Sequence, residues 1–527
     1  MEYLFLAGIL LLTFVMRIIP RTGLKYAFGG DTFFHLYMGG AIRNNKHRIP
    51  ATIPNIVLDH DYTYPYLYHW LLSFLKKENR LLAERMTGPI LDTVNTFIVF
   101  VFSGWAVHHF SIIAPWYFPL LVALLFSLSP ALLSVSGGPR AYSGSPRILG
   151  QTLYLLHITA YFYFSITGNV AVLCLSIFCG SLLLISSKFG VQVLLFFGVF
   201  VGIFYSPFYF LVILISIIIC GLFTKGRVFK VIEGHFRHSE FYLKFLKSVN
   251  QAIGPKRDLM DLKVYLARFR GNLKIFFRGR IITFLKWVFS ERYFMHFTII
   301  AFPQLILLAI VHDKFGTNDV LIKFLFLWVG TSIVWFILTS IGYLRFLGEG
   351  ERYLEFSLTG STFLATLYLV KNDMQEWVVF YTIYCFVIYL LHVSIFRERY
   401  STRSKEYYKD DSLFEELNGM EKGVILPFGN EWQMLYRADH PLLTYGANID
   451  TRKIPVEDFN HIFYNAHMPS EHINEFVERF KVKYILTNKE NLETYLTDVY
   501  KDRGKFDSIT EKILESKNFI VLKLKDH

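Results

Sequence analysis

The stretch "EYLFLAGILLLTFVM", residues 2–16, is almost entirely apolar and indicates which solvent most of the chain meets. Of the 527 residues, 53% are hydrophobic and only 18% are charged, values typical of a protein that lies largely in lipid. Because a spanning helix needs roughly 20 apolar residues, we expect an α-helical polytopic membrane protein with about eleven transmembrane helices over residues 1–397. The runs that carry this expectation are residues 2–16, 93–107, 114–134, 150–167, 169–186, 189–204, 206–223, 294–311, 324–343, 356–370 and 377–396.

After residue 397 the composition changes, and charged residues occur throughout. "VILPFG" (424–429), "VKYILTN" (482–488) and "FIVLKLK" (519–525) are typical of strands. "SEHINEFVERF" (470–480) has the pattern of an amphipathic helix, with Ser470 as its expected cap. We therefore expect residues 398–527 to form a small soluble α/β domain.

The insert at residues 224–290 contains fifteen lysines and arginines and four acidic residues. The positive-inside rule places such a segment in the cytoplasm, whereas seven spans after an inside N-terminus place it outside. We expect the C-terminal domain to lie outside. Aromatic and basic residues at helical spacing in the insert predict interfacial helices that bind anionic membrane lipids, and this position of the basic excess does not indicate nucleic acid.

The segment "FGGDTFFHLYMGGAIRNNKHRIP" (28–50) opens a polar first loop, residues 20–82, directly after the first apolar run. Asp31 and His35 are four residues apart and share a face if the segment is helical. Asp31 is either a helix cap or a functional carboxylate. His35 either has its hydrogen bonds satisfied within a helix bundle or orients Asp31.

Further polar residues follow in the same loop. Asp59 and Asp61 lie in "LDHDYTYP" (58–65) with Tyr64, and His69 begins another aromatic helix. Aspartates are common in turns, which is one explanation for the pair. The other explanation is that Asp59 and Asp61 bind a magnesium or manganese ion together with a donor phosphate, because these ions prefer carboxylate oxygens.

An apolar helix, an aspartate at the head of an amphipathic helix, and a polar loop ending in "YP" together resemble the first extracytoplasmic loop of the GT-C superfamily. These polytopic enzymes use polyprenyl-phosphate-linked sugars and include oligosaccharyltransferases and protein mannosyltransferases. In that family the first-loop acid is the catalytic carboxylate, and the resemblance gives this role to Asp31. The "WWD" signature and the paired "DE" of these two groups are absent, so neither acceptor is implied.

The resemblance implies a membrane glycosyltransferase that moves a sugar from a polyprenyl-phosphate-linked donor to an acceptor hydroxyl at the extracytoplasmic face. Asp31 would be the general base of an inverting displacement, and His35 would assist it. The sugar is left open, as is the choice of a glycan, lipid or protein acceptor. Many enzymes of the superfamily need no metal, so metal use is also open. We expect a bacterial inner membrane, with the endoplasmic reticulum as the alternative.

Basic residues that could bind the donor phosphate occur in two other segments. Arg140 and Arg147 lie in the loop at residues 137–153 and can each clamp a phosphate, or can simply snorkel at a helix end. Glu351 and Arg352 belong to a charged group at residues 342–360, which either lines a site or forms a solvated loop. The resemblance assigns contact with the lipid phosphate to Arg352.

Two other functional classes remain open. A polyprenyl-linked glycan polymerase or ligase would share the many helices and paired arginines, but would carry its catalytic loop late in the chain. A non-enzymatic transporter of lipid-linked glycans would explain the helices and the basic insert. It would not require a soluble tail or an acidic and histidine-rich first loop.

Overall fold

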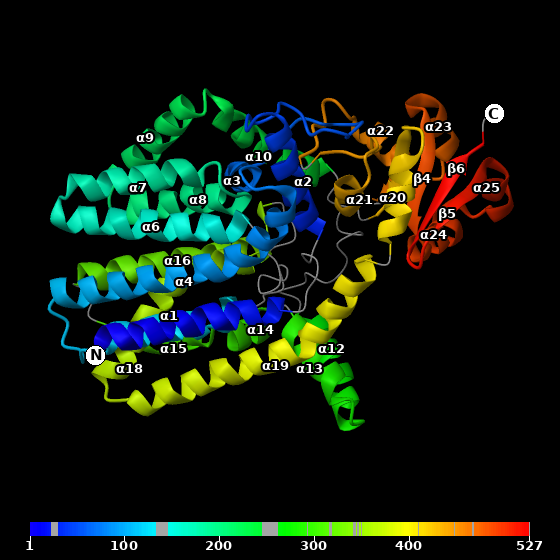
Figure 1. Ribbon diagram of the computed structural model, residues 1–527. Helices are drawn as coiled ribbons and strands as arrows, with labels where there is room; N and C mark the ends of the chain where they lie inside the picture. Colours follow the sequence, from blue (N-terminus) through cyan, green and yellow to red (C-terminus); the bar gives the residue numbers. More distant parts are fainter. Residues whose placement is uncertain are drawn as a thin grey trace. The chain divides into compact units, whose positions relative to one another are not determined.

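Helices make up most of the chain, as its apolar runs predict (Figure 1). The computed structural model describes residues 1–22, 30–132, 146–244, 262–291, 293–315, 319–340, 344, 347–348, 350–408, 410–429, 431–446, 448–465 and 468–525. The chain divides into two units. The helical unit contains Met1–Thr22, Glu84–Phe229 and Lys256–Arg399, and the α/β unit contains Gly23–Ala83, Lys230–Pro255 and Tyr400–His527.

Long helices of the helical unit, among them α1, α4, α6 and α19, have roughly parallel axes (Figure 1). Within this unit α6 packs against α7 and α8, and α16 packs against α8 and α18. The helices of this unit, or those that begin or end in it, are α1 (Glu2–Ile18), α4 (Lys77–His109), α5 (Phe118–Leu128), α6 (Pro146–Thr167), α7 (Val170–Leu183), α8 (Lys188–Phe204), α9 (Phe208–Phe223), α12 (Leu262–Phe277), α13 (Ile281–Ser290), α14 (Phe294–Ala301), α15 (Pro303–Val311), α16 (Val320–Ser340), α17 (Glu351–Glu355), α18 (Leu358–Lys371) and α19 (Gln375–Tyr408), with short 3-10 turns at Ile19–Arg21, Pro130–Leu132 and His312–Lys314.

Within the described residues, four helices are long and apolar enough to cross a membrane, so the expected eleven spans are wrong. A fifth results if α9 and α10 (Arg227–Lys244), bent by 116°, count as one broken span. Several predicted runs form helices that are too short to cross a membrane. About 30 Å of hydrocarbon requires roughly 20 residues at 1.5 Å each. The four candidate spans are Glu2–Arg21, Lys77–His109, Val320–Ser340 and Gln375–Arg397.

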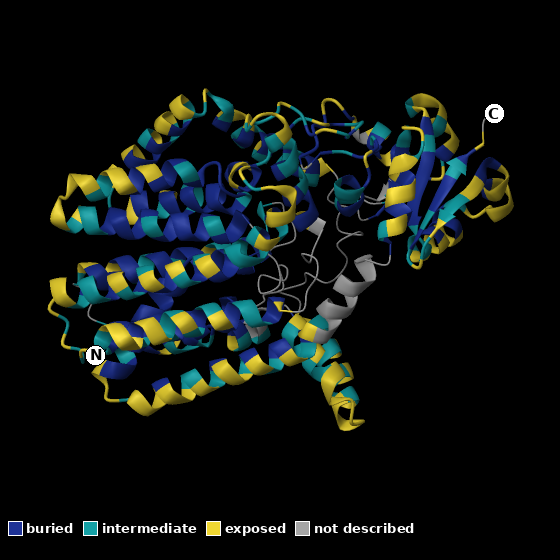
Figure 2. Ribbon diagram, in the orientation of Figure 1, coloured by how far each residue is buried: buried dark blue, intermediate teal, exposed yellow. Residues whose placement is uncertain are grey.

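Large apolar side chains are exposed along one side of α19. Trp377, Phe380, Ile383, Phe386 and Leu390 are each at least 42% exposed and recur at helical spacing. Figure 2 shows exposed residues on the outer faces of several helices of this unit, and many of the exposed residues are large and apolar. Soluble monomers rarely expose apolar surface on this scale, so these faces are suited to contact with lipid. The helical unit therefore has the properties of a membrane-associated domain.

The α/β unit contains a four-stranded sheet of order β1-β4-β6-β5. β1 pairs with β4 in parallel, and the other pairs are antiparallel. Its elements are α2 (Gly30–Asn44), α3 (Leu67–Ser73), α10 (which begins at the boundary of the two units), α20 (Asp411–Gly419), β1 (Val424–Phe428), α21 (Glu431–Arg437), α22 (Val456–Ile462), β2 (Phe463–Asn465), β3 (Met468–Pro469), α23 (Ile473–Phe480), β4 (Val482–Asn488), α24 (Lys489–Thr494), the π-helix Tyr495–Tyr500, α25 (Arg503–Ile509), β5 (Thr510–Glu515) and β6 (Phe519–Leu524).

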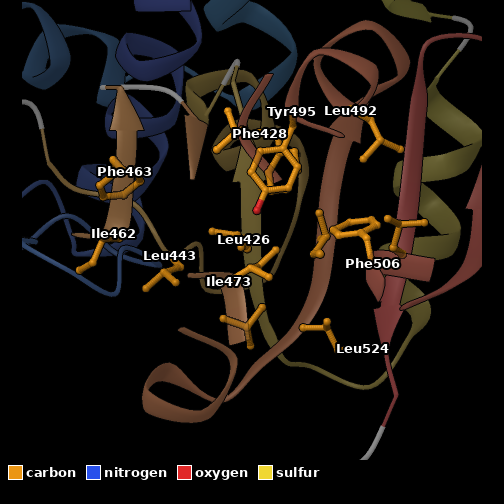
Figure 3. Close-up of a cluster of buried hydrophobic side chains, with 14 of the residues drawn as sticks. Leu426, Phe428, Leu443, Ile462, Phe463, Ile473, Leu492, Tyr495, Phe506 and Leu524 are labelled. Atoms are coloured by element: carbon orange, nitrogen blue, oxygen red, sulfur yellow. The ribbon is translucent and has the colours of Figure 1, made fainter. Parts of the chain in front are cut away.

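The core of this unit lies against the sheet. Figure 3 shows Leu426 and Phe428 of β1 near Tyr495 and Phe506, which come from the helical segments after β4. All four side chains are at most 1% exposed. The predicted strands at β1, β4 and β6 are confirmed, because their apolar side chains fill this core.

The predicted helix at residues 470–480 forms as α23, but Ser470 is not its cap. The N-cap residue is His472, and its side chain makes no capping hydrogen bond. The Ser470 hydroxyl instead accepts a hydrogen bond from the backbone N–H of His472 and donates one to the carbonyl of His461. Ser470 therefore stabilises the turn that precedes the helix.

The first polar loop joins the C-terminal sheet by backbone pairing. Leu442 forms parallel bridges with both Ile56 of the loop and Ile425 of β1. The N–H of Leu442 donates to the carbonyl of Asn55 at 2.8 Å, and the N–H of Leu443 donates to the carbonyl of Ile425 at 2.8 Å. These bridges explain why residues 23–83 belong to the same unit as residues 400–527.

Candidate functional site

Asp31 lies in the first turn of α2, directly after Gly30, where the helix begins, and its side chain is exposed. A helix N-terminus carries partial positive charge and stabilises an ionised carboxylate there. The predicted helix over these residues is confirmed, so Asp31 and His35 share a face of α2 one turn apart.

His35 is the first member of a buried chain of polar side chains. Its Nδ1 lies 2.7 Å from Nε2 of His69 in α3, and Nδ1 of His69 is hydrogen-bonded to the hydroxyl of Tyr62. His35 is 3% exposed and His69 is fully buried. We name this group the Tyr62–His69–His35 chain.

Both imidazoles are neutral at pH 7. Burial lowers the pKa of His35 to about 3, and burial together with the nearby His35 lowers the pKa of His69 well below its ordinary value. A neutral imidazole has one donor and one acceptor nitrogen, so the chain has two tautomeric arrangements. If Tyr62 donates to His69, then His69 donates to His35, and Nε2 of His35 is a donor. The opposite tautomers reverse every bond and make this nitrogen an acceptor.

Aromatic rings enclose the two histidines. Tyr64 stacks on His69 with ring centroids 5.7 Å apart, and Phe34 meets the same imidazole edge-on at 5.4 Å. The structure thus brings the predicted residues His35, Tyr64 and His69 together. Sequence reasoning missed Tyr62, whose only signal was its position in the aromatic segment seven residues before His69.

Asp59 and Asp61 belong to an ion-pair network. One carboxylate oxygen of Asp61 accepts hydrogen bonds from Lys453 at 2.6 Å and from Arg237 at 3.1 Å. Burial raises the pKa of Asp61, but the hydrogen bonds from these two cations outweigh it and lower the pKa below its ordinary value. Asp59 is buried and accepts a hydrogen bond from the N–H of Asp450 at 2.6 Å.

This network leaves little place for a divalent cation. The ammonium of Lys453 lies between the two aspartates, 3.7 Å from Asp59 and 2.6 Å from Asp61. Arg237 also pairs with Asp450 at 3.2 Å. A magnesium or manganese ion would have to displace two cationic groups from these oxygens, so the donors present fit a protein ion-pair network and not a metal site.

The predicted basic residues belong to the helical unit. Arg147 in α6 is buried, and its Nε lies 3.8 Å from a carboxylate oxygen of Glu355. Gln151, one turn later, donates to the backbone carbonyl of Glu355 at 2.9 Å. Buried charges are usually paired, and Arg147 follows this rule. The other predicted arginine of this segment, Arg140, lies outside the described residues.

Glu351 and Arg352 begin the short helix α17. Glu351 is 2% exposed, and the guanidinium of Arg352 lies 4.5 Å from the centre of the Phe189 ring, a cation–π contact. Two carboxylates of this charged segment, Glu351 and Glu355, are thus buried within the helical unit, whereas Arg345 and Glu349 lie outside the described residues.

Arg17 of α1 and Asp92 of α4 form another buried ion pair of the helical unit. Arg17 Nε lies 3.0 Å from the carboxylate of Asp92, and both side chains are 2% exposed. Arg17 also donates to the carbonyl of Ser127 at 2.5 Å. The pair links two candidate membrane spans.

No protein-family model matches this chain, and no curated protein matches its sequence. The fold and these contacts define a helical membrane-associated protein with an attached α/β unit, in which an exposed carboxylate lies one turn from a buried histidine pair.

Proposed function

We propose that this protein is a membrane glycosyltransferase of the GT-C type, which moves a sugar from a polyprenyl-phosphate-linked donor to an acceptor hydroxyl. The observation that carries the proposal is the position of Asp31. Its carboxylate is exposed at the head of α2, one turn from the buried and neutral Tyr62–His69–His35 chain. A carboxylate in this position can act as the general base for an acceptor hydroxyl.

In the proposed step, Asp31 takes the proton of the acceptor hydroxyl as its oxygen bonds to the anomeric carbon of the sugar. The bond from that carbon to the phosphate oxygen breaks, and the lipid phosphate leaves with the electron pair. Attack opposite the leaving group inverts the anomeric configuration. Neutral His35 presents a nitrogen on the same face of α2 and positions the carboxylate or the acceptor.

The leaving phosphate requires positive charge. Arg147, Arg352 and Arg140 are the residues that we propose for this role, since guanidinium groups bind phosphate through parallel N–H bonds. Of these three, Arg147 is buried in α6, with its Nε 3.8 Å from a carboxylate oxygen of Glu355. We place the reaction at the extracytoplasmic face of a bacterial inner membrane, with a glycan, lipid or protein as the acceptor.

The test is sugar transfer by the purified full chain in detergent. A panel of radiolabelled polyprenyl-phosphate sugars is offered with a membrane extract as acceptor, and Asp31→Asn is compared with the wild type. The control is Asp498→Asn, which makes the same change at an exposed carboxylate of the π-helix. We expect Asp31→Asn to lose roughly 10²- to 10⁴-fold in rate, the usual contribution of a general base, and the control to keep its rate.

Transfer at the wild-type rate by folded Asp31→Asn protein would refute the role of Asp31. Failure of the wild type to use any donor of the panel would refute the glycosyltransferase proposal itself. Movement of the labelled donor across a vesicle membrane without transfer would favour a transporter.

A further inference from the structure

A second polar cluster of the α/β unit lines a pocket of about 830 Å³. The second half of α2, the beginning of α4 and the helix α21 form its walls. A pocket of this volume is in the range that holds a nucleotide-sized ligand. None of the residues discussed so far as the candidate site belongs to its lining.

The lining carries an excess of positive charge. Five basic side chains, Arg43, Lys76, Lys77, Arg80 and Arg437, line the pocket with two acidic ones, Glu78 and Asp439. Asp439 is already paired with Lys422 at 2.7 Å, and Arg437 is paired with Asp411. Among the described residues, Arg43, Arg80 and the two lysines form no ion pair with a carboxylate. The protein itself therefore leaves this charge largely uncompensated.

Backbone carbonyl groups hold the two arginines in place. Arg80 donates through Nε to the carbonyl of Leu75 at 3.1 Å. Arg43 donates through Nη1 to the carbonyls of Ser73 and Phe74 at 3.3 and 3.2 Å. Among the described residues each arginine uses only one of its nitrogen atoms in such bonds, so further N–H groups are available as donors to a ligand.

The two guanidinium groups are close enough to repel each other. Burial lowers the pKa of Arg80 and the charge of Arg43 also lowers it, whereas Tyr436 and the carboxylate of Glu78 act in the opposite direction. Gly40 makes room for the Arg80 side chain, since a Cβ at position 40 would lie 2.7 Å from Nη1 of Arg80. Two like charges held side by side by neutral carbonyls favour an anion that contacts both.

We propose that this pocket binds a phosphate-bearing ligand, with its phosphoryl or diphosphoryl group on Arg43 and Arg80 and its outer oxygens near Lys76 and Lys77. Guanidinium groups match phosphate oxygens in geometry, and two exposed lysines add charge suited to a di- or trianion. Asn55 also lines the pocket, and its amide side chain is suited to the hydroxyl-bearing part of such a ligand. The proposal does not rest on the glycosyltransferase function.

The test measures binding to the full chain in detergent by titration calorimetry, with two probes. Inorganic pyrophosphate represents a free phosphate compound, and farnesyl diphosphate represents a lipid-linked one. We expect at least one probe to bind, with an affinity that falls as salt is added. If farnesyl diphosphate binds more tightly than pyrophosphate, the natural ligand is a lipid-linked phosphate. If it binds equally or more weakly than pyrophosphate, the natural ligand is a free phosphate compound.

Two double variants connect binding to the pocket. Arg43→Gln/Arg80→Gln is expected to weaken binding about tenfold or more, because each charge-assisted hydrogen bond is strong. Lys76→Gln/Lys77→Gln changes two exposed side chains that hold no structural contact among the described residues, so its folding is not at risk. It should weaken binding severalfold.

The matched control changes two exposed lysines of the same unit that do not line the pocket, Lys501→Gln/Lys505→Gln. This control should bind as the wild type does. Absence of binding of either probe to the wild type would overturn the proposal. Wild-type affinity of the Lys76→Gln/Lys77→Gln protein for the bound probe would also overturn it.

Discussion

Acid should loosen the segment around α2 and α3 at a pH well above that at which the carboxylates titrate. An unfolded chain carries histidines with an ordinary pKa near 6.5, whereas burial lowers the pKa of His35 in the folded protein to about 3. Between these two values the unfolded chain binds more protons than the folded one. The free energy of unfolding therefore falls as the pH is lowered from about 6.5 and is constant above that range.

The size of the effect follows from these two pKa values. At pH 5 an unfolded histidine of ordinary pKa is almost fully protonated and His35 is neutral, which corresponds to about 2 kcal/mol of lost stability relative to pH 7. The lowered pKa of His69 adds to the loss with the same sign. Asp61 has a lowered pKa and loses its contribution only at more acidic pH, so the window from pH 5 to 6.5 isolates the histidines.

Hydrogen exchange of α2 amides, corrected for the intrinsic exchange rate at each pH, is the assay. Protection in the full chain in detergent should fall at least about thirtyfold between pH 7 and pH 5, the equivalent of the loss of about 2 kcal/mol from His35 alone. His60→Gln, at an exposed histidine of the same unit, is the control and should behave as the wild type. Equal protection at both pH values would refute the reasoning. Imidazole NMR signals of His35 and His69 that titrate near pH 6.5 in the folded protein would refute it too.

Two substitutions test other parts of the structure. Asp92→Asn should destabilise the helical unit by about 3 kcal/mol, because it removes the carboxylate that balances the buried charge of Arg17. Unfolding in mixed SDS micelles measures this loss, and a change below about 0.5 kcal/mol would contradict the prediction. Gly40→Ala should weaken binding of the pyrophosphate or farnesyl diphosphate probe severalfold, because the new Cβ displaces the Arg80 guanidinium. The control is Gly271→Ala, whose new Cβ meets nothing within 4 Å and which should leave calorimetric binding unchanged. Equal affinity of both variants would contradict the proposed ligand geometry.

Apolar runs in the sequence predicted that the first part of the chain is helical but overestimated the number of membrane spans. The run at 114–134 shows why. In the structure it contains α5, where all residues from Phe118 to Leu128 except Leu121 and Leu124 are buried by the protein. Apolarity alone does not distinguish a helix that faces lipid from one that fills a protein core, so short buried helices were counted as spans.

Strand prediction failed where the strand is polar. β5 lies at the edge of the sheet, and its Thr510–Glu515 segment exposes several charged side chains, which makes its sequence typical of a surface helix or loop. The central strands β4 and β6 were predictable because their buried side chains make the sequence apolar.

Local spacing predicted the part of the site that lies within one helix. Asp31 and His35 are four residues apart, and α2 places them on one face. The partners of Asp61 could not be predicted in this way, because Arg237 and Lys453 are 176 and 392 residues away in the chain. Contacts over such separations are set by the pairing of elements in the fold, and no local sequence pattern contains them.

The helix dipole explains the charges at the two ends of α2 but not the polar side chains that pack beside them. An acid in the first turn and Arg43 in the last turn both complement the helix dipole, so Asp31 and Arg43 could stabilise this helix alone. The dipole does not account for what the next elements bring to the same helix: His69 of α3 beside His35, and Arg80 of α4 beside Arg43. At 1.5 Å per residue, the two polar clusters are separated by about 18 Å along α2, measured from Asp31 to Arg43. Substitutions at such a distance usually have additive effects, so loss of transfer at one end and loss of anion binding at the other can be measured independently.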